Sequence, residues 1–113
     1  MLVFALRATD VDLVADRLAE ALTWPFAKHN SMYLGDYCLH RVPGLREVKV
    51  RWNRDPLHNP ATDPPEERHR ERGHPEYDVL IYASLPPSEV TGFQEALKAQ
   101  FPEAVLIRSE KPG

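Results

Sequence analysis

Apolar residues recur with two spacings along this chain: every second residue in some stretches, and every third or fourth in others. The first spacing is typical of strands and the second of helices. The longest nearly unbroken apolar run lies within His74 to Leu85 and is apolar on both sides, which is typical of a central strand. Further strands are predicted over Leu2–Ala8, Ser31–Val42, Glu47–Asn53 and Ala104–Arg108.

Two stretches have the helical spacing. The first helix has a cap at Thr9 or Asp10 and stops before Pro25, because proline cannot continue a helix. The second opens at Pro86-Pro87 and stops at Pro102. Their predicted buried residues are Val11, Val14, Leu18 and Leu22 in the first helix, and Val90, Phe93 and Leu97 in the second.

The stretch from Ser31 to Asn53 predicts a β-hairpin that turns at Pro43-Gly44. Gly35 interrupts its first strand, which indicates a bulge or bend. Apolar and polar residues alternate along the second strand, so one face is expected to be buried and the other to be charged and exposed to solvent. The buried face would carry Val48, Val50 and Trp52, and the charged face Glu47, Lys49, Arg51 and Asn53.

A long polar loop over residues 54–76 follows, and it carries Pro56, Pro60, Pro64, Pro65 and Pro75. A loop this long in a compact domain is usually functional or mobile. Asp63 and Pro64 could start a short helical turn over Glu66 to Arg72. The mixed charges of that run are typical of a solvated surface.

The order β-α-β-β-β-α-β predicts an α+β fold, a two-layer sandwich with two helices on one face of a mostly antiparallel sheet of about five strands. The arrangement is ferredoxin-like with an added strand. The length of 113 residues fits a single domain over residues 1–113. The other face of the sheet is left for solvent or for a partner.

Charge and cysteine content narrow the functional classes. A formal net charge of −3 argues against nucleic acid as a direct ligand, because phosphate binding needs an excess of Lys and Arg. The single cysteine, Cys38, excludes an internal disulfide framework, so a cytoplasmic location is expected. No apolar run approaches the roughly 20 residues that span a bilayer, so no membrane association is expected.

Cys38 and His40 are the residues most capable of chemistry, since they share one face of a predicted strand. Their spacing matches no strong zinc pattern, even with His29, His69 or His74, so no metal and no cofactor is predicted. Residues two apart on a strand have Cβ atoms about 7 Å apart, which is long for a nucleophile and its base. An enzyme using Cys38 with a histidine remains a third alternative, and the chain is predicted not to be an enzyme.

Four pieces of the chain carry a resemblance to a known group. They are Ser31–Tyr37, Arg51–Asp55, Pro75–Tyr82 and Val105–Glu110. In this order they resemble small bacterial immunity proteins, which are encoded beside polymorphic or contact-delivered toxins. The proline-rich insertion between Asn53 and Tyr77 is longer than in that group.

The resemblance implies a cytoplasmic protein that binds a cognate toxin domain and blocks its active site. It supplies no contact residue. The polar hairpin face and the loop are the expected contact surface, because tyrosines are enriched at interfaces and the loop is polar and long. The predicted interface residues are Tyr33, Asp36, Tyr37, Arg51, Arg54, Asp55, Asp63, Glu66 and Glu67.

One alternative belongs to a different class. A ferredoxin-like domain with a free sheet face could bind a small ligand, or could act as a regulatory domain that forms a homodimer through that face.

Overall fold

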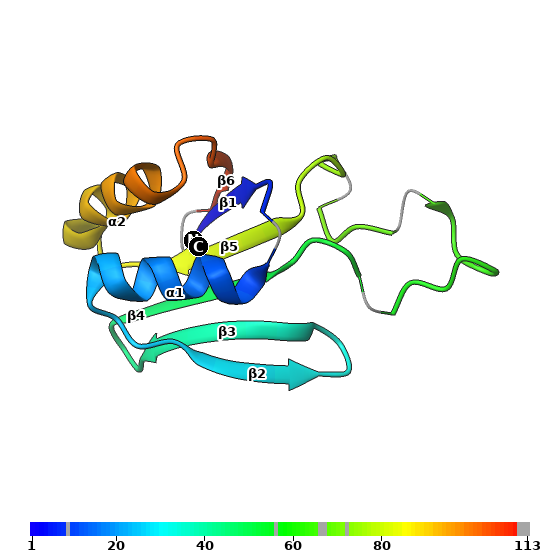
Figure 1. Ribbon diagram of the computed structural model, residues 1–113, viewed down its shortest axis with the longest axis horizontal. Coiled ribbons are helices and arrows are strands. Elements are labelled where there is room, and N and C mark those ends of the chain that lie inside the picture. Colours follow the sequence, from blue (N-terminus) through cyan, green and yellow to red (C-terminus); the bar gives the residue numbers. More distant parts are fainter. Residues whose placement is uncertain (9, 56, 66–67, 72, 111–113) are drawn as a thin grey trace.

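The structure is a computed structural model, and it describes residues 1–8, 10–55, 57–65, 68–71 and 73–110. Its elements are β1 (Leu2–Leu6), α1 (Val11–Leu22), β2 (Ala27–Ser31), β3 (Gly35–Val42), β4 (Arg46–Trp52), β5 (Val79–Ser84), α2 (Pro87–Gln100) and β6 (Val105–Ser109). The long loop between β4 and β5 extends beyond the body of the molecule (Figure 1).

The six strands form one sheet in the order β2-β3-β4-β5-β1-β6, and all neighbours are antiparallel. Strands β4, β5, β1 and β6 with the two helices reproduce the ferredoxin-like arrangement. Strands β2 and β3 extend that sheet at the β4 edge. The predicted α+β two-layer fold is therefore confirmed, with β5 central and six strands in place of about five.

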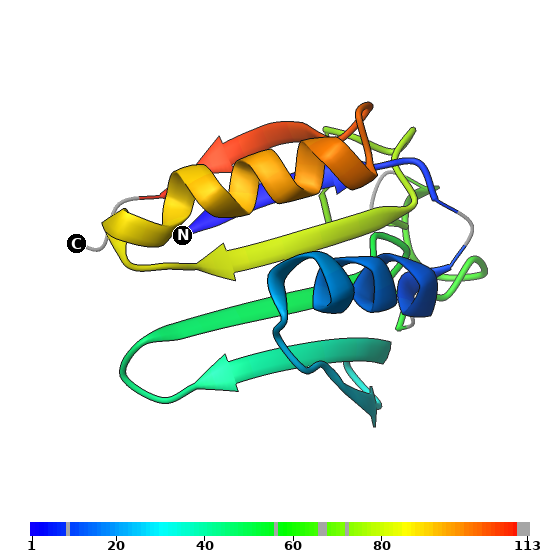
Figure 2. The same cartoon turned by 60° about the vertical axis from the view of Figure 1, so that its left-hand side comes forward.

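Both helices lie on one face of the sheet (Figure 2). Asp10 caps α1 by accepting a hydrogen bond from the backbone N–H of Asp12, and α1 ends at Leu22 with Thr23 as its C-cap, as predicted from Pro25. The buried stripes of the two helices meet the inward residues of the sheet in one apolar core. That core includes Val14, Leu18, Phe93 and Leu97 from the helices, and Phe4, Val48, Val50 and Ile81 from the strands.

The prediction of one strand over Ser31–Val42 with a bulge or bend at Gly35 is wrong, because this glycine begins a new strand after a hairpin turn. Ser31 pairs with Gly35, so Met32 to Leu34 form the turn between β2 and β3. The Oγ atom of Ser31 accepts hydrogen bonds from the backbone N–H groups of Tyr33 and Leu34. Gly35 has a φ of 69°, a left-handed conformation that glycine adopts without steric cost.

The expected wet face of β4 is also partly wrong, because Arg51 is only 5% exposed and Asn53 is fully buried. The reason is the returning part of the long loop. Its backbone pairs with the end of β4 through the N–H of Arg70, which donates to the carbonyl oxygen of Asn53 at 2.6 Å. Burial lowers the pKa of Arg51, with Arg70 adding to the effect. Lys49 remains half-buried on the same face.

Candidate functional site

The turn of the β2–β3 hairpin and the start of the long loop enclose a hollow of about 450 Å³, which we call the hairpin hollow. Asp36 lines it from β3, and Arg54 and Asp55 line it from the loop. Asn30 holds Asp36 in place, since its Nδ2 donates a 2.6 Å hydrogen bond to Oδ1 of Asp36. Residues far apart in the sequence therefore present charged side chains to one space.

Beside this hollow, the hairpin turn exposes two large side chains. Met32 is 75% exposed and Tyr33 is 70% exposed, the highest values among the large hydrophobic residues described. The two hydrogen bonds to Ser31 fix the backbone of this turn. Exposed aromatic and methionine side chains on a fixed backbone are typical anchors of protein interfaces.

The outer part of the loop is braced by its own hydrogen bonds. Oδ1 of Asp55 accepts from the backbone N–H of Leu57 at 2.9 Å. Further out, Oδ2 of Asp63 accepts from the N–H of Asn59 at 2.9 Å, and Asn59 Oδ1 accepts from the N–H of Ala61 at 3.0 Å. These short-range bonds link neighbouring residues of the protrusion to one another.

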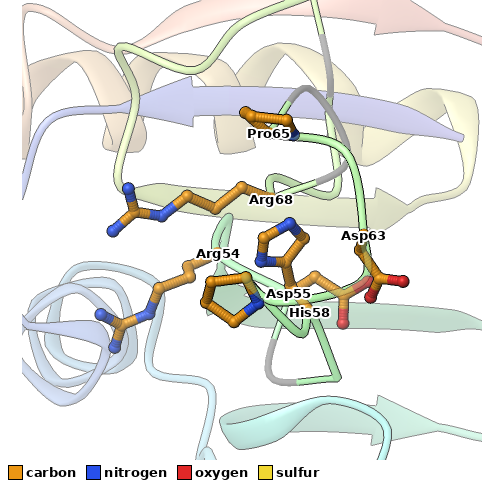
Figure 3. Close-up of a pocket in the computed structure, with 7 residues that line it drawn as sticks. Arg54, Asp55, His58, Asp63, Pro65 and Arg68 are labelled. Carbon is orange, nitrogen blue, oxygen red and sulfur yellow. The ribbon is translucent and has the colours of Figure 1, made fainter.

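A second space at the inner side of the loop contains arginine and aromatic residues. We call it the arginine hollow. It measures about 360 Å³ and is lined by Trp52, Arg54, Arg68, His69, Tyr77 and Asp78. Arg54 and Arg68 also line a neighbouring hollow of about 370 Å³ together with Asp55, His58 and Asp63. Figure 3 shows both guanidinium groups extending to one side of the loop, with the carboxylates of Asp55 and Asp63 on the other.

The structure brings several predicted interface residues together. Asp36, Arg54 and Asp55 share the hairpin hollow, and Asp63 lies beyond it in the loop. Tyr33 lies on the adjoining turn. Tyr37 instead lies on the sheet, where its ring stacks on His29 with centroids 5.2 Å apart.

Other predicted interface residues are either buried or lie outside the described part of the chain. Arg51 is buried, because the loop covers it. Glu66 and Glu67 lie outside the described residues, as does Arg72, so three of the seven residues of the predicted helical turn are not described. The described stretch from Arg68 to Glu71 is not helical.

Other residues at the site were not predicted. Met32 was overlooked because its neighbours read as a continuous strand, although Ser31 and Gly35 together signal a turn. Trp52 was assigned to the core, but it also lines both the hairpin hollow and the arginine hollow. The sequence places Arg68 in a charged run that is typical of a solvated surface. Nothing in the sequence indicates that the loop folds back and brings Arg68 beside Arg54.

The pair considered for chemistry lies in the core. Cys38 is 1% exposed, and its thiol contacts Oδ1 of Asp12 at 3.4 Å. Burial, together with this hydrogen bond, raises the pKa of Cys38 to about 12. A buried thiol in its protonated form is a poor nucleophile toward a substrate from solvent, which argues against an enzyme that uses Cys38.

His40 has a structural role. Its Nδ1 lies 2.8 Å from the carbonyl oxygen of Pro25, and Nε2 accepts a 2.9 Å hydrogen bond from Nε of Arg46. Its ring stacks on Trp24. Among the described residues, no group of three or more His, Cys, Asp or Glu side chains is arranged to hold a metal ion.

No protein-family model, curated protein or solved structure matches this chain. Within the part of the chain that the structure describes, neither helix is long and apolar enough to cross a membrane.

Proposed function

We propose that this chain is a toxin-neutralising immunity protein, which binds a cognate bacterial toxin domain in the cytoplasm and blocks its active site. One observation carries the proposal. A braced, protruding loop lies beside a hairpin turn that exposes Met32 and Tyr33. The resemblance of four sequence pieces to immunity proteins supplies the class of partner.

The mechanism we propose is steric occlusion. A protrusion with a defined conformation loses little conformational entropy on binding, which favours insertion into a cleft. Met32 and Tyr33 would anchor the complex beside it. The carboxylates of Asp36, Asp55 and Asp63 would complement a basic toxin surface and guide its approach.

The test is co-expression with the toxin domain encoded by the adjacent gene. We expect restored cell survival and co-purification of the two proteins. Survival no better than with the toxin alone would rule the proposal out. The double variant Met32→Ala/Tyr33→Ala should weaken binding by about 100-fold, as expected for interface anchors. The matched control is Leu45→Ala, because Leu45 is exposed in the β3–β4 turn at the opposite end of the hairpin.

The alternative is a ferredoxin-like ligand-binding or regulatory domain that dimerises through the sheet face opposite the helices. It is favoured by the half-exposed Tyr37, Leu39 and Lys49 on that face. The returning loop argues against it, because Glu71 contacts Tyr82 and Arg108 on the same face and would obstruct a second sheet. A monomer by light scattering, without a thermal shift across a metabolite panel, would count against this alternative.

A further inference from the structure

Backbone hydrogen bonds between the two arms of the long loop border the arginine hollow. The N–H of Asp55 donates to the carbonyl oxygen of Arg68 at 2.8 Å, and Arg54 forms an antiparallel bridge with His69. The outgoing and returning parts of the loop therefore run side by side at the hollow. Because of this pairing, Arg54 and Arg68 line the same hollow although they are far apart in sequence.

Asn53 fixes the other wall of the hollow. Its side chain is fully buried, and Nδ2 donates to the carbonyl oxygens of His74 and Tyr77, each at 2.9 Å. Oδ1 of Asn53 accepts from the N–H of Glu71 at 2.9 Å. All three bonds hold the returning chain against the end of β4, so the position of Tyr77 relative to Trp52 is set by the fold.

The lining has a distinctive chemistry for a chain with a net charge of −3. Among the described residues that line the hollow, two are arginines and one is histidine, and Asp78 is the one with a carboxylate. Trp52 and Tyr77 supply the aromatic part of the lining. The guanidinium of Arg7 lies 6.0 Å from the Tyr77 ring centroid and adds positive charge nearby.

We propose that the arginine hollow binds a nucleoside monophosphate, with the phosphate on Arg54 and Arg68 and the base against Trp52 and Tyr77. The planar guanidinium fork matches phosphate oxygens in pairs, and aromatic side chains stack on any base. The volume of about 360 Å³ lies in the range of small-ligand sites. A carboxylate from a peptide would use the arginines and leave the aromatic side chains without a partner.

This inference goes beyond the proposed function and does not depend on it, because binding is measured on the isolated chain. The experiment is calorimetric titration with AMP, UMP, adenosine and inorganic phosphate at low salt. We expect AMP and UMP to bind at least about tenfold more tightly than adenosine or phosphate alone. Binding should weaken as salt is raised, because exposed charges are screened.

Variants locate the site. Arg54→Gln and Arg68→Gln should each weaken AMP binding by about tenfold, which is the usual effect of losing one charge-assisted contact. The matched control is Arg41→Gln, since Arg41 is an exposed arginine on β3 paired with Glu47. Thermal unfolding of each variant checks that the fold is kept. Trp52→Phe should abolish the AMP-dependent change in tryptophan fluorescence without changing the melting temperature by more than a few degrees.

Three outcomes would overturn the proposal. The first is the absence of heat from either nucleotide at about 1 mM. The second is equal weakening in the Arg41→Gln control, which would indicate non-specific charge attraction. The third is binding of inorganic phosphate as tight as that of AMP, which would exclude a role for Trp52 and Tyr77.

Discussion

The hydroxyl group of Tyr82 donates a 2.9 Å hydrogen bond to Oε1 of Glu71, on the face of the sheet opposite α1 and α2. Oε2 of Glu71 accepts a second bond from Arg108 of β6, also at 2.9 Å. One carboxylate from the long loop thereby joins the central strand β5 to the edge strand β6. Burial, together with the bond to Glu71, raises the pKa of Tyr82 to about 12.

Removing either partner should loosen the returning loop. We expect Tyr82→Phe to lower the free energy of unfolding by about 1 kcal/mol, the usual net value of one hydrogen bond. Glu71→Ala should cost about 2 kcal/mol, because it leaves the Tyr82 hydroxyl without its partner and leaves Arg108 paired with Glu110 alone among the described residues. Urea unfolding measures both values. Tyr33→Phe is the control and should change stability by less than about 0.5 kcal/mol, since Tyr33 is exposed. Equal effects of Tyr82→Phe and Tyr33→Phe would show that the contact with Glu71 contributes nothing.

Local periodicity was enough to predict both helices and the central strand. The predicted stripe of Val11, Val14 and Leu18 is buried in α1, because burial on a helix depends on residues three and four apart. Strand β2 was not predicted, because Ala-Lys-His-Asn-Ser has no apolar alternation. Its residues are almost all exposed, and it is held by backbone pairing with β3.

The candidate site was predictable only in part. Asp36, Arg54 and Asp55 are predicted because they belong to the polar hairpin face and the long loop, and the structure places them around one hollow. The burial of Arg51 and Asn53 could not be predicted, because their cover comes from a segment about twenty residues further along the chain. Such long-range contacts leave no local pattern in the sequence.

Asn53 should be the most sensitive residue of the loop. Asn53→Ala removes a buried side chain that satisfies three backbone groups, so we expect a loss of about 2–4 kcal/mol in the free energy of unfolding. Limited proteolysis should then cut within residues 54–76 at lower protease concentrations than in the wild type. Asn30→Ala is the matched control, since Asn30 is exposed and bonds only Asp36 among the described residues. Unchanged proteolysis of Asn53→Ala would contradict the bracing role.

Arg46 should be irreplaceable even by lysine. Its guanidinium donates to His40 and to both carboxylate oxygens of Glu89, and it lies 4.2 Å from the Trp24 ring centroid. A lysine cannot reproduce this planar set of contacts. We expect Arg46→Lys to cost about 1–3 kcal/mol in urea unfolding, whereas Arg41→Lys on the exposed face should cost less than about 0.5 kcal/mol. Equal costs for the two variants would show that the planar geometry of Arg46 is unimportant.

The stabilising effect of the buried Cys38 thiol should decrease at alkaline pH. Its pKa in the folded chain is raised from 9.0 to about 12, so between these values the unfolded chain binds fewer protons than the folded one. The buried thiol therefore makes its full contribution to the free energy of unfolding below about pH 9. That contribution falls as the pH rises toward 12. We expect the stability difference between wild type and Cys38→Ala to shrink by about 1 kcal/mol or more between pH 8 and pH 10.5, as measured by urea unfolding. A stability difference that stays constant or grows with pH would contradict this prediction. Rapid modification of the native thiol by a disulfide reagent would also contradict it, because a buried thiol should react only when the chain unfolds.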